Sequence, residues 1–256
     1  MNSKEDDWTL LAGGSVNTVA RQGNVVRREL SAASPAVHQL LGYLKSQHLT
    51  QIPHLLGTDD THEYLRFIPG KTLTRPWRAA IKTDAWLAQL GDWLWRYHAT
   101  VAGFRLQGDA RFAWGPEVAE PDMIVCHGDL GPWNYVERRG ELVAVIDWDL
   151  AHYGYKLDDV AEVALESVPL RPNLETTMGK DTPREVLEQR LAAFCSSYGT
   201  QPDDVLRHLP NYLNKVIAQV REAADRGVEP FVSFVRRGTV EELERDKAYV
   251  EAVWVR

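Results

Sequence analysis

Side chains that could bind a metal ion and accept a proton are concentrated in one stretch, VCHGDLGPWNYVERRGELVAVIDWDLA, at residues 125–151. Asp129 and Asn134 lie five positions apart on an expected loop between two apolar segments, and Asp147 directly follows the apolar run VAVI. Burying an unpaired carboxylate among apolar side chains is costly in free energy. Three oxygen-bearing side chains in such a stretch therefore indicate a functional site.

The turn sequence RRGE, at residues 138–141, predicts a hairpin that brings these side chains together. The second strand of a hairpin returns beside the start of the first, so we expect Asp147 to lie near Asn134 and Asp129. Mg²⁺ prefers oxygen ligands from carboxylates and phosphates, and phosphoryl transfer also uses a carboxylate that accepts the proton of a hydroxyl nucleophile. Each residue alone is more often part of a turn or a strand end. Together, and in this order, they favour phosphoryl transfer.

The composition is that of an ordinary globular protein, with 44% hydrophobic and 25% charged residues among 256. The net charge is -7 and no run of Lys and Arg exceeds a pair, so we expect no nucleic-acid partner. No apolar run is long enough to cross a membrane, and the N-terminal MNSKEDDW does not resemble a signal peptide. With only Cys126 and Cys195 as thiols, we expect a cytoplasmic protein without disulfides. The sequence does not specify an oligomeric state.

The elements that must position the site fall into two unlike parts. Residues 8–30 and 52–70 predict short strands joined by turns, and a helix between them begins at Ser34. From residue 84 onwards the pattern is mainly helical, apart from the hairpin. Helices are expected over residues 84–104, 159–168, 183–198, 202–226 and 239–253. This α+β pattern predicts a small β-rich N-lobe, residues 1–69, and a larger, mainly helical C-lobe, residues 70–256, with a ligand cleft between them.

The motif H-G-D-x-x-x-x-N, followed by I-D-W-D, resembles the catalytic and metal-binding signatures of the aminoglycoside phosphotransferase family. His127, Asp129, Asn134 and Asp147 match the defining positions, and the rest of the chain matches more loosely. The family belongs to the protein-kinase-like superfamily of small-molecule kinases. The resemblance implies a bilobal protein-kinase-like fold and an enzyme that uses Mg²⁺ and ATP or GTP. Its acceptor would be a hydroxyl of a small molecule, such as an aminoglycoside, another amino alcohol, a macrolide or a sugar.

The resemblance also implies roles for individual residues. Asp129 would be the catalytic base, and Asn134 and Asp147 would hold Mg²⁺ against the nucleotide phosphates. His127 would support the catalytic loop through backbone hydrogen bonds. The role of Asp149 stays open between support of the metal and contact with the substrate.

Three further positions surround this motif. Asp159, with Asp158 as the alternative, resembles the buried carboxylate that the family places before a helix. Trp133 and Trp148 flank the catalytic groups and are possible substrate contacts, whereas tryptophans at helical spacing are expected in the core.

The N-terminal strands resemble the nucleotide-binding part of the family. The turn that contains Gly13, Gly14 and Ser15 would cover the phosphates, and Phe67 and Ile68 would border the nucleobase. The strand NVVRREL, residues 24–30, would supply a cation for the phosphates. Because side chains alternate along a strand, only one of its two arginines, Arg27 and Arg28, can face the cleft, and the family register favours Arg27.

The first helix departs from the family pattern. Kinase-like enzymes pair the phosphate-binding cation with a Glu on this helix, but SPAVHQLLGYL contains no acidic residue. Either Glu29 takes that place, or Arg27 is positioned differently. The departure keeps an alternative open, a nucleotide-binding pseudokinase or regulatory module without transferase activity. A protein kinase is disfavoured because the segment after Asp147 is too short for an activation segment.

Overall fold

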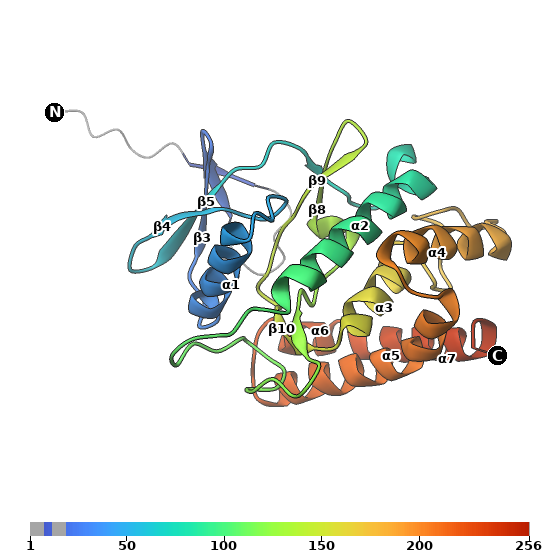
Figure 1. The fold of residues 1–256 in the computed structure, drawn as a ribbon. Helices are drawn as coiled ribbons and strands as arrows, with labels where there is room; N and C mark the ends of the chain where they lie inside the picture. Colours follow the sequence, from blue (N-terminus) through green and yellow to red (C-terminus); the bar gives the residue numbers. More distant parts are fainter. Residues whose placement is uncertain (1–7, 12–18, 256) are drawn as a thin grey trace.

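The computed structural model describes residues 8–11 and 19–255, which form a small β-rich lobe and a larger, mainly helical lobe (Figure 1). The small lobe is a five-stranded antiparallel sheet in the order β1-β2-β3-β5-β4, with helix α1 (Ser34–Ser46) against it. The strands are β1 (Thr9–Leu10), β2 (Ala20–Gln22), β3 (Val25–Glu29), β4 (Leu55–Thr58) and β5 (His62–Arg66). The predicted α+β architecture is therefore confirmed.

The register of β3 against β5 decides which side chains of the small lobe reach the cleft. Arg28 lies opposite Glu63 in this antiparallel pair, and Arg27 lies opposite Tyr64. Directly opposite residues on adjacent strands point to the same side of the sheet. Arg28 and Glu63 therefore share one face, and Arg27 lies on the other.

The predicted hairpin forms strands β8 (Tyr135–Arg138) and β9 (Glu141–Val145), joined at Arg139 and Gly140, which both have positive φ. Strand β6 (Lys71–Thr72) pairs with β8, so the segment that leaves the small lobe is attached to the hairpin. Strands β7 (Ile124–Cys126) and β10 (His152–Gly154) form a second antiparallel pair. These two short sheets place the ends of β7 and β9 next to the small lobe, and Ile146 N donates to Asn134 O at 2.9 Å.

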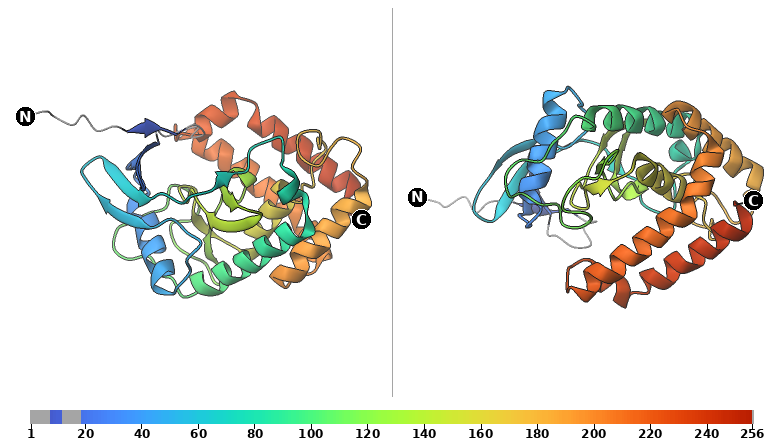
Figure 2. Two further views of the ribbon diagram at one scale, coloured as in Figure 1. Left: turned by 90° about the horizontal axis from the view of Figure 1, so that it is seen from above. Right: turned by 60° about the horizontal axis from the view of Figure 1, so that its bottom comes forward.

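The helices of the large lobe surround these strands (Figure 2). They are α2 (Asp84–Val101), α3 (Lys156–Glu166), α4 (Arg184–Tyr198), α5 (Pro202–Asp225), α6 (Phe231–Arg236) and α7 (Thr239–Val253), with short 3₁₀ turns at Ala79–Lys82 and Pro132–Asn134. Helix α3 begins before its predicted start, because Lys156 to Asp158 already form its first turn and Tyr155 N donates to Asp158 at 3.1 Å. Helix α6 was not predicted. Its six residues are too few to show a helical period.

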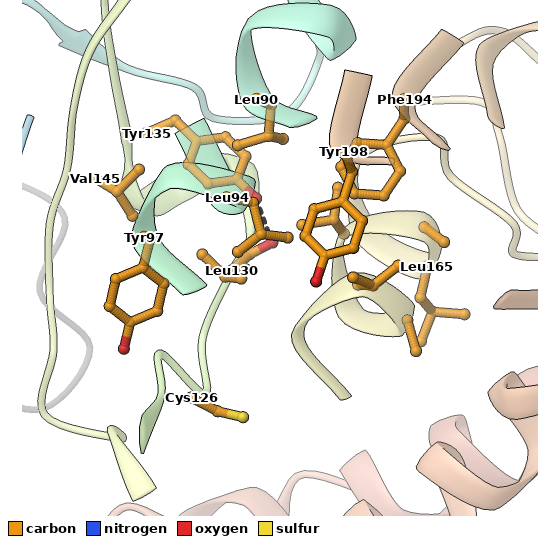
Figure 3. Close-up of a cluster of buried hydrophobic side chains, with 14 of the residues drawn as sticks. Leu90, Leu94, Tyr97, Cys126, Leu130, Tyr135, Val145, Leu165, Phe194 and Tyr198 are labelled. Carbon is orange, nitrogen blue, oxygen red and sulfur yellow. Dashed lines mark hydrogen bonds between the residues drawn. The ribbon is translucent and has the colours of Figure 1, made fainter. Parts of the chain in front are cut away.

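The core lies where α2 crosses α4 and covers the hairpin (Figure 3). The expected apolar face of α2 is fully buried, including Leu90, Trp93 and Tyr97. Gly91 allows the close crossing, since a Cβ there would lie 2.7 Å from Phe194 O. Both cysteines are buried free thiols. In the part of the chain that the structure describes, no helix is long and apolar enough to cross a membrane.

Candidate active site

The loop after β7 carries Asp129 and is held from below by two carboxylates of helix α3. Asp159, which is 1% exposed, accepts hydrogen bonds from His127 N at 3.1 Å and from Gly128 N at 3.4 Å. One helical turn further on, Glu162 accepts a hydrogen bond from Leu130 N at 2.9 Å. Because residues three apart share a face of a helix, both carboxylates reach the same loop. The structure thus places Asp159, and not Asp158, under the catalytic motif, and Glu162 is a support that the motif did not identify.

Two further features fix the shape of this loop. His127 is buried, with Nε2 3.2 Å from Ile146 O, and its Nδ1 accepts the backbone N–H of Asp129 at 3.2 Å. Gly128 has a φ of +78°, and a Cβ there would lie 2.2 Å from Leu150 O, so only glycine fits. The loop backbone is therefore set by its own sequence and by its contacts with α3 and with the end of β9.

The carboxylate of Asp129 is held by its two neighbours on the loop. Asn134 Nδ2 donates to Oδ2 at 2.7 Å, and Trp133 Nε1 donates to Oδ1 at 3.0 Å. Burial, reinforced by the negative charge of Asp147, raises the pKa of Asp129 to about 7, although both hydrogen bonds act to lower it. A carboxylate with a pKa near neutrality can accept a proton at physiological pH and is a stronger base than an ordinary Asp.

Asp147 lies directly after β9 in a left-handed backbone conformation, with a φ of +65°. Such a conformation is uncommon for a residue other than glycine and often marks a functional position. Its side chain is 47% exposed and, together with Asn134, borders a cleft of about 540 Å³ between the two lobes. Asp129, Asn134 and Asp147 are thus brought together at the end of the hairpin, as the sequence predicts.

The arginine that reaches the cleft is Arg28 rather than Arg27, so the predicted register of this strand is wrong. Arg28 Nη1 lies 3.1 Å from Asp147 Oδ1. The guanidinium of Arg27 lies on the opposite face of the sheet, 4.5 Å from the centre of the Trp8 ring. The sequence correctly places the two arginines on opposite faces of the strand. Which of these faces is turned to the cleft depends on how β3 pairs with β5.

A carboxylate partner for this arginine comes from strand β5. Arg28 Nε donates to Glu63 Oε1 at 2.7 Å, and Glu63 is only 2% exposed. His38 of helix α1 lies against the other oxygen, with Nε2 2.6 Å from Glu63 Oε2. Glu29, the candidate suggested by the sequence, is exposed at the end of β3. An acidic side chain beside Tyr64 and Leu65 in a predicted strand was the available signal for Glu63.

Asp149 is the third carboxylate in contact with Arg28. Its Oδ1 lies 2.5 Å from Arg28 Nη2. Burial raises the pKa of Asp149, against the opposing effect of the Arg28 charge. The attraction of Asp149, Glu63 and Asp147 raises the pKa of Arg28 despite its burial, so this arginine is permanently charged.

The two tryptophans beside the motif have different environments. Trp133 is 40% exposed and borders the cleft. Trp148 also adjoins the cleft, but its side chain is only 1% exposed, donates to Val145 O at 3.1 Å and packs edge-on against Trp93 and Tyr97. The expectation that Trp148 contacts the substrate is therefore wrong, because its ring belongs to the core.

The positions expected to bind the nucleotide are only partly described. Phe67 and Ile68 border the cleft, and the guanidinium of Arg21 lies 3.5 Å from the centre of the Phe67 ring. Gly13, Gly14 and Ser15 lie outside the described residues. The described lining of the cleft thus combines apolar side chains such as Phe67 and Ile68 with charged ones such as Arg21 and Asp147.

The side chains at the hairpin end fit a hard divalent cation. Both hydrogen bonds from Asn134 to Asp129 use its amide nitrogen, so the amide oxygen is the end of the side chain suited to a cation. The exposed carboxylate of Asp147 supplies a second oxygen. Mg²⁺ is commonly bound by one or two protein oxygens together with substrate phosphates and water.

Comparison with known proteins gives a family match for the part of the chain that contains these residues. Residues 108–204, which contain Asp129, Asn134, Asp147 and Asp159, match the model of the phosphotransferase enzyme family. The chain is also 33% identical over 152 residues to the trifolitoxin immunity protein of Rhizobium leguminosarum bv. trifolii. That match covers 57% of this chain and 56% of the relative, so the chain spans just over half of the relative's length.

Solved phosphotransferase structures share the fold over almost the whole chain. Amicoumacin kinase hAmiN, solved with AMP-PNP, Ca²⁺ and Ami, has a TM-score of 0.65 at 14% identity and matches 98% of this chain and 90% of its own. Macrolide 2'-phosphotransferase MphH from Brachybacterium faecium has a TM-score of 0.54 at 18% identity, over 97% and 93% of the two chains. The ADP-bound aminoglycoside phosphotransferase APH(2'')-Ib has a TM-score of 0.57 at 13% identity, over 97% and 95%. The two-lobed kinase-like fold expected from the sequence is thereby confirmed.

Proposed function

We propose that this phosphotransferase-family protein transfers the γ-phosphate of ATP or GTP to a hydroxyl group of a small molecule, with Mg²⁺ as the metal. The observation that carries the proposal is the environment of Asp129. This carboxylate is held at two oxygens and has a pKa raised to about 7. Asn134, which contacts Asp129, lines the cleft between the lobes together with Asp147 and the positively charged Arg28. Base, cation and metal ligands together are the parts that phosphoryl transfer requires.

Each group has a distinct task in this proposal. The ionised Asp129 orients the acceptor hydroxyl and accepts its proton as the oxygen attacks the γ-phosphorus. The guanidinium of Arg28 binds phosphate oxygens and offsets their charge. Mg²⁺ held by Asn134 and Asp147 would neutralise the phosphate charge that develops during transfer. Trp133, exposed beside Asp129, lines the side of the cleft from which the acceptor approaches.

The raised pKa of Asp129 predicts an acid limb in the pH profile. A protonated carboxyl cannot accept the hydroxyl proton, so kcat/KM should rise with pH and reach half of its plateau near the pKa of about 7. The measurement is kcat/KM for nucleotide-dependent phosphorylation between about pH 5.5 and 8.5 at fixed ionic strength. A profile that stays flat through this range would exclude Asp129 as the base with this pKa.

The experiment that tests the proposed function is a search for acceptor-dependent nucleotide turnover. Purified protein with Mg²⁺ and either ATP or GTP is assayed for nucleoside diphosphate release across hydroxylated metabolites, aminoglycosides, macrolides and amicoumacin. Trifolitoxin is included because of the name of the sequence relative. The expected result is release with at least one acceptor, above a background measured with the Asp129→Asn variant. Equal release from both proteins with every acceptor would contradict the proposal.

The proposed function also assigns roles to the two lobes and a compartment to the protein. We propose that residues 1–69 and 70–256 act as nucleotide-binding and acceptor-binding lobes, and that the protein works in the cytoplasm.

The pseudokinase alternative was motivated by the missing carboxylate on the first helix. Glu63 now supplies a partner for the cleft arginine, which removes that motivation.

A further inference from the structure

A chain of polar contacts runs from helix α1 to the edge of the nucleotide cleft. His38 of α1 contacts Glu63 of β5 at 2.6 Å, and Glu63 contacts Arg28 of β3 at 2.7 Å. Arg28 in turn contacts Asp149 at 2.5 Å and Asp147 at 3.1 Å, both beyond β9 in the other lobe. Helix α1 lies beside the sheet that contains β3 and β5 (Figure 1). One side chain, Arg28, therefore joins the two lobes at the cleft.

The three nitrogens of the guanidinium have different partners. Nε is held by Glu63, whose side chain is 3% exposed. Nη2 is held by Asp149, whose side chain is 28% exposed. Nη1 contacts Asp147, whose side chain is 47% exposed and is the most exposed of the three carboxylates. Asp147 is also a candidate metal ligand. A cation bound by Asp147 would compete for this last contact. The two more buried contacts would still fix the plane of the guanidinium, with Nη1 directed into the cleft.

Glu63 is suited to this task because it is ionised, buried and held at both carboxylate oxygens. Burial raises its pKa, but the hydrogen bond with His38 and the charge of Arg28 outweigh that effect and hold the pKa below its ordinary value. The carboxylate therefore keeps its charge at neutral pH. An arginine side chain loses considerable rotamer entropy when it is ordered, so anchors already present in the free protein lower the cost of binding a phosphate.

We propose that Glu63 and Asp149 are positioning residues that present the guanidinium of Arg28 to the nucleotide phosphates, and that His38 fixes Glu63 to helix α1. The inference rests on the proposed function, since it requires a nucleotide in the cleft. It gives Asp149 a task distinct from that of Asp147. It also places the partner of the phosphate-binding cation on strand β5, with a histidine at the helix.

Nucleotide binding tests this directly and needs no acceptor. Affinities for non-hydrolysable ATP and GTP analogues with Mg²⁺ are measured by calorimetry for the wild-type protein and for Glu63→Gln and Asp149→Asn. Each variant should bind about tenfold more weakly, because each loses a charge-assisted anchor of Arg28. The matched control is Glu29→Gln, which removes an exposed carboxylate next to Arg28 in the sequence and should bind as the wild type does. Unfolding midpoints without nucleotide verify that each variant is folded.

A double-mutant cycle separates positioning from a general structural role. If Glu63 acts through Arg28, adding Glu63→Gln to Arg28→Gln should cost no further affinity. For His38, the Gln variant retains a hydrogen-bond donor for Glu63 and should bind more tightly than the Phe variant.

Wild-type affinity retained by both Glu63→Gln and Asp149→Asn would overturn this inference and leave the proposed function standing. If Glu63→Gln does not fold, Asp149→Asn alone decides. A wild-type protein that binds neither analogue would overturn the proposed function and this inference with it.

Discussion

Replacing Asp129 with Asn should lower kcat for phosphate transfer by about 10²–10⁴-fold, the usual contribution of a general base. The amide keeps the size of the carboxylate and can still accept a hydrogen bond from Trp133, but it cannot accept the proton of the acceptor hydroxyl. Because Asp129 is not among the groups expected to bind the nucleotide, the affinity for ATP or GTP should be unchanged. Steady-state kinetics with the acceptor found by the turnover screen, together with calorimetric nucleotide binding, measure both quantities.

The control for this substitution is Asp109→Asn, which makes the same chemical change at an exposed position of the loop before β7. It should retain wild-type kcat and nucleotide affinity. If Asp129→Asn keeps more than about a tenth of the wild-type kcat, the proton must be accepted elsewhere and the role given to Asp129 is wrong.

Replacing Asp159 with Ala should give the largest loss of stability, about 3–5 kcal/mol in the free energy of unfolding. The carboxylate is buried and is the shared acceptor for His127 N, Gly128 N and His98, whose Nε2 lies 3.0 Å away. Removing it leaves two backbone donors and a buried histidine without this partner. Urea unfolding followed by tryptophan fluorescence measures the change.

A surface carboxylate provides the comparison. Asp92, 60% exposed, pairs with Arg96 at 3.0 Å on the outer face of α2. Asp92→Ala should cost no more than about 0.5 kcal/mol, because solvent screens an exposed ion pair. If Asp159→Ala were as mild as Asp92→Ala, the catalytic loop could not depend on α3 as described.

The catalytic part of the site was predictable because its geometry is local. Asp129 and Asn134 are joined by one short loop, and a tight turn fixes where β9 ends relative to them. The hydrogen bond from Ile146 N to Asn134 O then places Asp147 beside the loop. Two lobes were also predictable, since strand-like and helix-like periods occupy different parts of the chain.

The arginine that reaches the cleft was not predictable, because its orientation depends on the pairing of β3 with β5, which is distant in the sequence. Alternation shows that Arg27 and Arg28 face opposite sides, but only the register against β5 decides which side is the cleft. The same register supplies Glu63, thirty-five residues away in the sequence. A search for an acidic partner on the helix therefore failed for a physical reason, since the partner lies on the adjacent strand.

The prediction that Trp148 contacts the substrate was wrong for a related reason. Trp148 lies between Asp147 and Asp149 in an irregular segment after β9, so strand alternation does not show which way its side chain points. Only the packing of the fold directs its indole into the core against Trp93 and Tyr97. Trp133 lies in the short 3₁₀ turn and remains partly exposed.

In the proposed reaction, a phosphoryl group leaves a nucleotide and arrives on an acceptor hydroxyl held at Asp129. The most direct test is mass spectrometry of the acceptor after incubation with protein, Mg²⁺ and ATP or GTP. We expect an acceptor heavier by one phosphoryl group with the wild-type protein, far less of it with Asp129→Asn in the same time, and none when Mg²⁺ is chelated. Nucleotide binding by the wild type without phosphorylated product from any acceptor tested would contradict the proposed reaction.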